Sequence, residues 1–375
     1  MKLLLNGGGS TKQLKLTMAK LNQIINHCKP ILYVPLAMNE IEHSYDSCYE
    51  WFQKQIENVD VPDVDMPRTF LEFASKNFDD YSAIFIGGGN TYKLLKGIKD
   101  NSIFNKIIEY LKNNGIVVGC SEGAIIFGYD INSILVMDKN EVNLVDTKGF
   151  NILNGKSIFA HYTNSKTEEI HQRYTNFLIN YSKEHEEVIA IPEEDTIYID
   201  DEKIEFLGSR PYYEFREGVM TMNSIFQLVP YTDEYYNFVY EVKKNAYKKY
   251  VEECWGKWDE DAQRKYFDTF INQVEKDAWI IQLNGVDIGF YNGMNIDDET
   301  YEIGNICIIP EYQGKGIGTS VLKDIIKLHE NQNILIQYFK QNPVGKLYER
   351  LGFIPNGETE FHYQMIRPKQ EVLKK

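Results

Sequence analysis

The chain has 375 residues, of which 43% are apolar and 25% are charged, and this composition excludes a wholly disordered or collagen-like protein. Its 40 basic and 55 acidic side chains give a formal charge of −15, which argues against binding to nucleic acid because a phosphate backbone needs a basic face. The length predicts two domains, each large enough to bury a core of its own.

The cysteines and the first residues bear on the compartment. Five cysteines are scattered without a C-x-x-C pair, which predicts free thiols in a reducing environment. The start, MKLLLNGGGS, has only three consecutive leucines, too few for the core of a signal peptide. Because no run of about eighteen apolar residues occurs, we expect no transmembrane helix, no membrane partner and a cytoplasmic location. We also expect no metal cofactor.

The first half alternates short apolar runs with amphipathic stretches. Strands are predicted at 2–6, 30–36, 81–86 and 116–119, and helices at 12–28, 45–57 and 103–114. Continuous apolar strands alternating with helices are typical of a parallel sheet covered on both faces, so this half is predicted to be an α/β domain. Further along, antiparallel strands are predicted at 142–145 and 157–161, then a helix at 166–184 and strands at 188–191, 196–199 and 203–207.

The second half is predicted to begin at residue 222, which gives domains 1–221 and 222–375 with a short linker inside 216–224. Its predicted strands are 226–230, 279–283, 286–293, 301–309, 334–338 and 361–366. Its predicted helices are 233–251, one within 255–274, 319–330 and 344–351. Asn284-Gly285 is a strong signal for a hairpin turn between the second and third of these strands.

Residues 119–123, GCSEG, fit the pattern G-x-S-x-G between an apolar strand and a helix. Such a strained turn lifts the Ser121 hydroxyl to the end of the sheet and aims the N–H of Glu122 at a developing oxyanion. The alternative is a tight turn around a buried serine. A second glycine cluster, 87–89, is followed by Asn90-Thr91 and offers either further oxyanion N–H groups or a capped loop.

A serine nucleophile needs a base and a group that orients the base. His161 ends an apolar, strand-like run downstream of Ser121. Three acidic residues, Glu193, Glu194 and Asp195, follow another apolar run and are candidates for the orienting group. An exposed acidic turn would look the same in sequence.

The segments IFIGGGNTYKLL, GCSEGA, FAHY and IPEEDTIYI together resemble the dipeptidase E / cyanophycinase family of serine peptidases, over about residues 1–220. The resemblance implies a class I glutamine-amidotransferase-like (flavodoxin-like) fold and a short aspartyl peptide as substrate. The implied site residues are Ser121 as nucleophile, His161 as base, Glu193 as first choice for the acid, and Gly88, Gly89, Asn90 and Glu122 around the oxyanion and the substrate.

Glu122 departs from that family, in which a small residue usually follows the nucleophile. A carboxylate at this place opposes a developing oxyanion and repels an acidic substrate. Two hypotheses therefore stay open for the first half. It is either a serine dipeptidase or a catalytically silent ligand-binding or regulatory module.

In the second half, residues 313–318 read QGKGIG and lead from a predicted strand directly into a predicted helix. Successive N–H groups at such a helix start, unobstructed by Cβ atoms, form a site for a pyrophosphate. Dinucleotide binding is disfavoured because no acidic residue about twenty positions later suits a ribose.

The segments NICIIPEYQGKGIGTSVL and NPVGKLYERLGF resemble the GNAT superfamily of acetyl-CoA-dependent N-acetyltransferases, over about residues 222–368. The resemblance implies an α/β domain with a mixed sheet and acetyl-CoA as co-substrate. The residues implied to hold acetyl-CoA are Ile308, Gln313, Gly314, Lys315, Gly316, Ile317, Gly318, Thr319 and Asn342. Tyr348 would protonate the leaving thiolate and Glu302 would be the base, with helix–sheet packing and a solvated strand end as the respective alternatives.

Together the two halves predict a bifunctional enzyme, with an acetyltransferase whose first domain is silent as the alternative. The expected partners are a small-molecule amine or aminoacyl substrate and a short aspartyl peptide. The sequence leaves open a homodimer.

Overall fold

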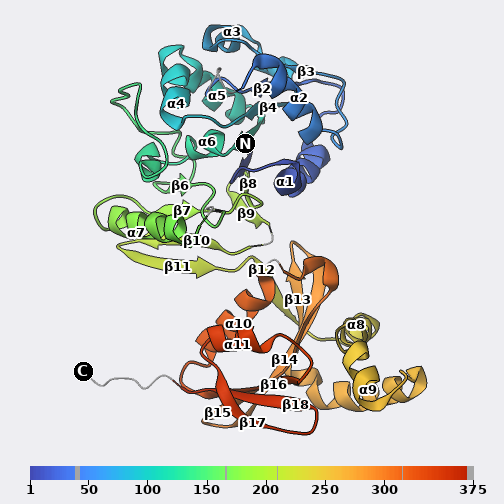
Figure 1. Cartoon of the computed structure of the whole chain (residues 1–375). Helices are drawn as coiled ribbons and strands as arrows, with labels where there is room; N and C mark the ends of the chain where they lie inside the picture. The colour runs from blue at the N-terminus through green and yellow to red at the C-terminus, as the bar shows by residue number, and fades with distance from the viewer. Residues whose placement is uncertain (39–42, 165–166, 209, 315, 370–375) are drawn as a thin grey trace. The chain divides into compact units, whose positions relative to one another are not determined.

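The computed structural model describes residues 1–38, 43–164, 167–208, 210–314 and 316–369. The chain divides into two compact units, Met1–Ile225 and Phe226–Lys375 (Figure 1). The sequence-based boundary lies four residues earlier. Each unit has its own sheets, so each is described by itself.

The first unit is built on a seven-stranded sheet with the order β3-β2-β4-β5-β1-β8-β9. Its strands are β1 (Lys2–Asn6), β2 (Ile31–Val34), β3 (Val64–Asp65), β4 (Ala83–Ile86), β5 (Ile116–Cys120), β8 (Thr196–Asp200) and β9 (Lys203–Leu207). The first five strands in this order run parallel, whereas β8 is antiparallel to β1 and β9 is antiparallel to β8. The predicted parallel α/β sheet is thus confirmed for five strands and ends in an antiparallel edge.

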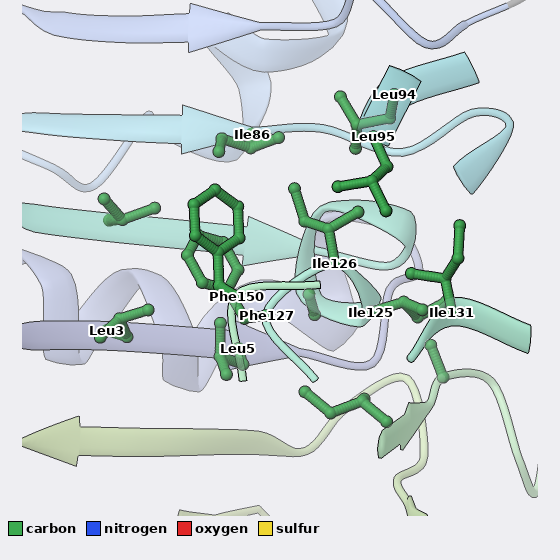
Figure 2. Packing of buried hydrophobic residues seen from close by; sticks show 14 of the residues in the cluster. Leu3, Leu5, Ile86, Leu94, Leu95, Ile125, Ile126, Phe127, Ile131 and Phe150 are labelled. Atoms are coloured by element: carbon green, nitrogen blue, oxygen red, sulfur yellow. The ribbon is translucent and has the colours of Figure 1, made fainter. Parts of the chain in front are cut away.

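Helices cover both faces of this sheet, because its strands are apolar on both sides. The helices of the unit are α1 (Thr11–Ile24), α2 (Tyr45–Gln55), α3 (Phe70–Ser75), α4 (Thr91–Asp100), α5 (Ile103–Lys112), α6 (Glu122–Ile125) and α7 (Glu168–Glu184). Leu4 of β1 belongs to the core under α1 and α2, whereas its neighbours Leu3 and Leu5 belong to the core under α4 and α5. Figure 1 shows these two pairs of helices on opposite sides of the sheet, and Figure 2 shows the packing around Leu3 and Leu5.

A second, four-stranded sheet has the order β11-β10-β7-β6, with β6 (Ser157–Phe159), β7 (Val188–Ala190), β10 (Tyr212–Arg216) and β11 (Val219–Asn223). Three predictions are wrong in this region. The strand expected at 157–161 exists as β6, but it pairs with β7 in parallel and not in the antiparallel sense that was expected. The expected linker 216–224 is half of the β10–β11 hairpin, which turns at Glu217 and Gly218 with positive φ angles of 52° and 78°. The expected strand at 142–145 is a turn instead, because the Asn140 side chain bonds both the N–H and the C=O of Leu144.

The second unit has one mixed sheet with the order β12-β13-β14-β15-β16-β18-β17. Its elements are β12 (Phe226–Pro230), α8 (Tyr236–Trp255), α9 (Glu260–Val274), β13 (Ala278–Leu283), β14 (Val286–Asp297), β15 (Thr300–Ile308), α10 (Ile317–Leu328), β16 (Asn333–Phe339), α11 (Gly345–Arg350), β17 (Ile354–Glu358) and β18 (His362–Arg367). Among the described strands of this unit, only β15 and β16 pair in parallel. The predicted mixed sheet and the Asn284-Gly285 hairpin are confirmed, with both turn residues at positive φ.

The helix predicted within 255–274 is confirmed as α9, which begins at Glu260. Gly256, with a φ of 90°, ends α8 at Trp255. The Asp259 side chain then caps α9 by accepting the Ala262 N–H at 2.9 Å.

The parallel strands of this unit pair over four residues and then part. Thr300–Ile303 of β15 pairs with Asn333–Ile336 of β16, whereas 304–308 has no partner in β16. Helices α8 and α9 cover one face of β14 and β15, where Phe290 and Cys307 join their apolar core. The apolar core formed by α8, α9, β14 and β15 therefore lies beside the point where β15 and β16 separate.

Among the residues that the structure describes, no helix is long and apolar enough to cross a membrane. Within the same residues no cluster of three or more His, Cys, Asp or Glu side chains is arranged to hold a metal ion. All five cysteines are free thiols.

Candidate functional sites

Ser121 lies in a strained turn between β5 and α6. Its φ and ψ are 57° and −116°, a conformation that L residues rarely adopt. Glycines on both sides are required by packing, since a Cβ at Gly123 would lie 2.1 Å from the Ile86 carbonyl oxygen and one at Gly119 would lie 2.3 Å from the Gly123 carbonyl oxygen. The turn thus forces the serine to the carboxyl end of the parallel strands.

Two further segments bring a base and an acid to this serine. Ser121 Oγ lies 2.7 Å from His161 Nε2, and His161 Nδ1 lies 2.8 Å from Glu193 Oε1. His161 follows β6 and Glu193 follows β7, two strands that pair in parallel and so deliver both residues to one edge. Burial alone would lower the pKa of His161, but the hydrogen bond with Glu193 and the nearby carboxylates raise it above its ordinary value.

Of the three acidic candidates, only Glu193 reaches the imidazole. Glu194 pairs with Arg210 at 2.6 Å, and the backbone carbonyl of Asp195 accepts the Gly7 N–H. Asn164 fixes the acidic turn by accepting the Glu193 N–H at 3.0 Å and donating to the Glu194 carboxylate at 3.2 Å. Sequence analysis did not single out Asn164, because a lone asparagine in a loop carries no spacing signal.

The Glu122 carboxylate is hydrogen-bonded to the backbone of the second glycine cluster. Its Oε2 accepts the backbone N–H of Gly89 at 3.0 Å and would lie only 2.5 Å from a Cβ placed on Gly88. Burial raises the pKa of Glu122, and hydrogen bonds from the Ser121 hydroxyl and from its own N–H oppose that rise. The Glu122 carboxylate therefore already accepts a backbone N–H group, that of Gly89, which sequence analysis assigned to the oxyanion of a substrate.

Two neighbouring residues have structural roles that the sequence did not settle. Asn90 caps α4, with its Oδ1 accepting the Lys93 N–H at 3.0 Å and its Nδ2 donating to the Lys139 carbonyl. Gly8 has a φ of 113°, and a Cβ there would lie 2.3 Å from His161 Cε1. The first glycine loop, residues 7–9, thus packs directly against the His161 imidazole. Sequence analysis had no signal for this role.

In the second unit, the glycine-rich loop ends at the start of α10. Gly314 and Gly316 have φ angles of 72° and 83°, and no described atom lies within 4 Å of a Cβ built on either. No described side chain caps α10, so the N–H groups of Ile317, Gly318 and Thr319 are left for an anion. This open cradle fits a pyrophosphate. Lys315 falls outside the described residues.

The remaining predicted acetyl-CoA contacts flank the same region. Gln313 Nε2 donates to the Ile308 carbonyl at 2.7 Å, which ties the loop to the end of β15. Asn342 Oδ1 accepts the Val344 N–H at 3.1 Å just before α11. Both side chains thus have a bond within the protein.

Tyr348 and Glu302 lie on elements that border the gap between β15 and β16. Tyr348 is buried on α11, and burial raises its pKa, with Cys307 as a further cause. Glu302 pairs with Met294, and Gly304 forms a bulge because Asn292 and Gly293 pair with Asn305 and Ile303. The bulge turns Glu302 to the same face of the sheet as Asn305 and Cys307.

A cluster on that face was not assigned from the sequence. Cys307 Sγ lies 3.5 Å from Tyr247 Oη, and Lys243 Nζ lies 2.8 Å from Asn305 Oδ1. Lys243 and Tyr247 are four residues apart on α8 and so share one face of the helix. The four-residue spacing was visible in the sequence. The sequence did not show that this face of α8 packs against Asn305 and Cys307 of β15.

Comparison with known proteins identifies both units. The profile of peptidase family S51 matches residues 3–207, and that of the acetyltransferase (GNAT) domain matches residues 275–355. Peptidase E of Pasteurella multocida (strain Pm70) is 26% identical over 209 residues, which cover 53% of this chain and 85% of that protein. Peptidase E of Escherichia coli O1:K1 / APEC is 27% identical over 142 residues, 36% of this chain and 59% of that protein.

Solved structures are similar to one unit at a time. The structure of a putative peptidase E protein from Listeria monocytogenes EGD-e has a TM-score of 0.43 and 21% identity, covering 55% of this chain and 98% of that chain. The PaiA N-acetyltransferase of Thermoplasma acidophilum in complex with coenzyme A has a TM-score of 0.31 and 18% identity, covering 38% and 98%. The S51 match spans more than half of the sequence and confirms the first resemblance, as the GNAT match confirms the second. The chain therefore belongs to peptidase family S51 and carries a GNAT acetyltransferase domain in its second unit.

Proposed function

We propose that the chain is a bifunctional enzyme that joins a serine hydrolase of the dipeptidase type to an acetyl-CoA-dependent N-acetyltransferase. The hydrogen-bonded series Ser121–His161–Glu193 supports the first activity. The open N-terminus of α10, beside the gap between β15 and β16, supports the second.

In the hydrolase, Ser121 is the nucleophile. His161 accepts the serine proton through Nε2 and passes it to the leaving amine, while Glu193 holds Nδ1 and stabilises the imidazolium. The backbone N–H groups of Gly89 and Glu122 are the oxyanion donors. The substrate class proposed from the family resemblance is a short aspartyl peptide.

The Glu122 carboxylate must leave these donors before a substrate carbonyl can use them. This one observation favours a second candidate function, in which the first unit is a catalytically silent module that binds a ligand. Covalent labelling by a fluorophosphonate, followed by intact mass measurement, separates the two. Labelling of the wild type but not of Ser121→Ala supports the hydrolase, and absence of labelling supports the silent module.

In the acetyltransferase, the N–H groups of the loop 313–318 and of the first turn of α10 hold the pyrophosphate of acetyl-CoA. An acceptor amine attacks the thioester carbonyl directly, and Tyr348 donates a proton to the departing thiolate. Glu302 is the carboxylate candidate for the group that takes the amine's proton. The proposed acceptor is a small-molecule amine or an aminoacyl compound.

The test of the transferase is release of coenzyme A from acetyl-CoA in the presence of a panel of amines. The panel contains amino-acid amides, aspartyl dipeptides and diamines, and the release is followed with a thiol reagent. Release that depends on the amine supports the proposal. Tight binding of acetyl-CoA without any transfer would leave the second unit as a sensor of coenzyme A.

A further inference from the structure

Lys243 lies in a confined position between α8, α9 and β15. Its Nζ is 2.8 Å from Asn305 Oδ1, 3.7 Å from the centre of the Phe270 ring and 5.2 Å from that of Tyr247. Asn305 is itself held, because its Nδ2 donates to Oδ1 of the buried Asn292 at 2.8 Å. The residue as a whole is half-buried, and its amine lies in buried surroundings.

The polar partner of this lysine is a neutral amide. Among the residues that the structure describes, no carboxylate forms an ion pair with Lys243. Burial lowers its pKa to about 8, against a small opposing effect of Cys307. The titratable groups on this face of the sheet and on the helices beside it are Cys307 and Glu302 on β15, Tyr247 on α8 and Tyr348 on α11. Burial raises the pKa of Cys307, Tyr247 and Tyr348, so these three are neutral near pH 8.

Lys243 is close to the place where acetyl transfer would occur. Asn305, its partner, lies on the segment of β15 that has parted from β16. Cys307, two residues on, is near enough to Lys243 and Tyr348 to influence the ionisation of both. Glu302 is three residues before Asn305 and so lies farther from Cys307 along the strand.

We propose that Lys243, in its neutral form, is the catalytic proton acceptor for the amine substrate, an assignment that rests on the proposed acetyltransferase function. The substrate ammonium gives one proton to Nζ, and the freed amine attacks the thioester carbon. The carbon–sulfur bond breaks and the thiolate takes the Tyr348 proton. The second N–H proton of the substrate then restores Tyr348, and Lys243 releases its proton to solvent.

This assignment also narrows the substrate class. An α-amino group titrates at roughly 7.7–8.0 and a lysine-type amine at about 10.4, both as free groups. Proton transfer to a group of pKa about 8 is nearly balanced for the first but unfavourable by roughly 250-fold for the second. Lys243 therefore favours the α-amino group of an aminoacyl compound over the amine of a diamine.

The test compares Lys243→Met and Lys243→Arg in the full chain, with Lys248→Met at an exposed position of the same helix as the matched control. Coenzyme A release is measured with glycinamide, aspartyl-alanine and putrescine. Both Lys243 variants are expected to lower kcat by roughly 100-fold or more while leaving the KM for acetyl-CoA unchanged. Arginine keeps the charge but cannot accept a proton at these pH values, so its failure separates base catalysis from charge and packing.

The pH profile and a direct titration complete the test. With glycinamide, whose ammonium must lose a proton, the wild-type kcat is expected to rise through about pH 8, and this rise is lost in Lys243→Arg. With an acceptor amine that is already neutral at pH 6 there is no proton for Lys243 to take, so the rise should be absent in the wild type as well. The ε-carbon of Lys243, observed by NMR in ¹³C-lysine protein and assigned with Lys243→Met, is expected to titrate at the same pH.

The outcomes separate this inference from the proposed function. If the wild type acetylates none of the amines, the proposed transferase and this role of Lys243 both fail. If the wild type is active but Lys243→Met keeps its kcat, the transferase stands and Lys243 is not the base. The same conclusion follows if Glu302→Gln abolishes the pH-dependent rise, or if Lys243 titrates above about 10.

Discussion

Replacing Glu122 by alanine is expected to increase hydrolysis, which is an unusual result for a change beside a nucleophile. In the resting structure the Glu122 carboxylate accepts the Gly89 N–H at 3.0 Å. A substrate carbonyl must displace this carboxylate before it can receive the Gly89 N–H. The alanine variant removes the competitor and keeps the backbone donors.

The size of the effect follows from the bond that is displaced. A hydrogen bond to a charged group contributes about 1.5–3 kcal/mol, and each 1.36 kcal/mol is a factor of ten in rate. We therefore expect kcat/KM for aspartyl dipeptides to rise by roughly 10- to 150-fold in Glu122→Ala. Relief of repulsion between Glu122 and an acidic substrate acts in the same direction.

The assay is release of free aspartate from aspartyl dipeptides, together with the rate of fluorophosphonate labelling of Ser121. Glu122→Gln is the matched variant, because it keeps the shape and a weaker acceptor while removing the charge, and we expect an intermediate gain. Ser121→Ala in the Glu122→Ala background must remove all of the activity. Equal or lower activity in Glu122→Ala, in a protein with unchanged thermal unfolding, would refute the idea that this carboxylate blocks the oxyanion donors.

Four further predictions concern both units. Ser121→Ala should abolish hydrolysis while acetyl transfer, measured as coenzyme A release, stays unchanged. Gly316→Asp should weaken acetyl-CoA binding in calorimetry, because φ is 83° and a negative charge would meet the pyrophosphate; Gly316→Ala separates backbone strain from charge. Tyr348→Phe should lower the kcat of transfer by roughly 100-fold or more with an unchanged KM for acetyl-CoA. Hydrolysis should rise with pH through a His161 pKa above its ordinary value, and Glu193→Gln should lower the pH of that rise.

The central fold was predictable because its signals are local. β1 and β5 are short apolar runs that tolerate burial on both faces, and the Asn284-Gly285 turn sets the β13–β14 register through its own backbone preference. The errors arose where a side-chain hydrogen bond or pairing with a distant strand determines the local structure. The Asn140 side chain closes a turn around a run that alternates like a strand, and the hairpin at 216–224 pairs through β10 with β7, which lies far earlier in the chain.

The site was predictable as a set of residue types but not as a geometry. Motif spacing singled out Ser121, and the number of histidines and acids after it left few candidates for the partners. The choice of Glu193 over Glu194 depends on Arg210, which pairs with Glu194 and cannot be placed by a local pattern. The direction of the Glu122 side chain likewise depends on the Gly89 N–H, thirty-three residues earlier, and no sequence pattern carries that contact.

Both units have backbone N–H groups exposed by glycines, but the N–H group of Gly89 is bonded within the chain, whereas those at the start of α10 have no described side-chain partner. At Gly89 the donor is already bonded to a carboxylate of the chain itself, whereas at the start of α10 no described side chain caps the helix. Binding at α10 therefore has no internal anion to displace, but binding at Gly89 must first break a charged hydrogen bond. It follows that acetyl-CoA should bind to the resting protein directly, while the hydrolase should respond mainly to ligands that compete for Glu122.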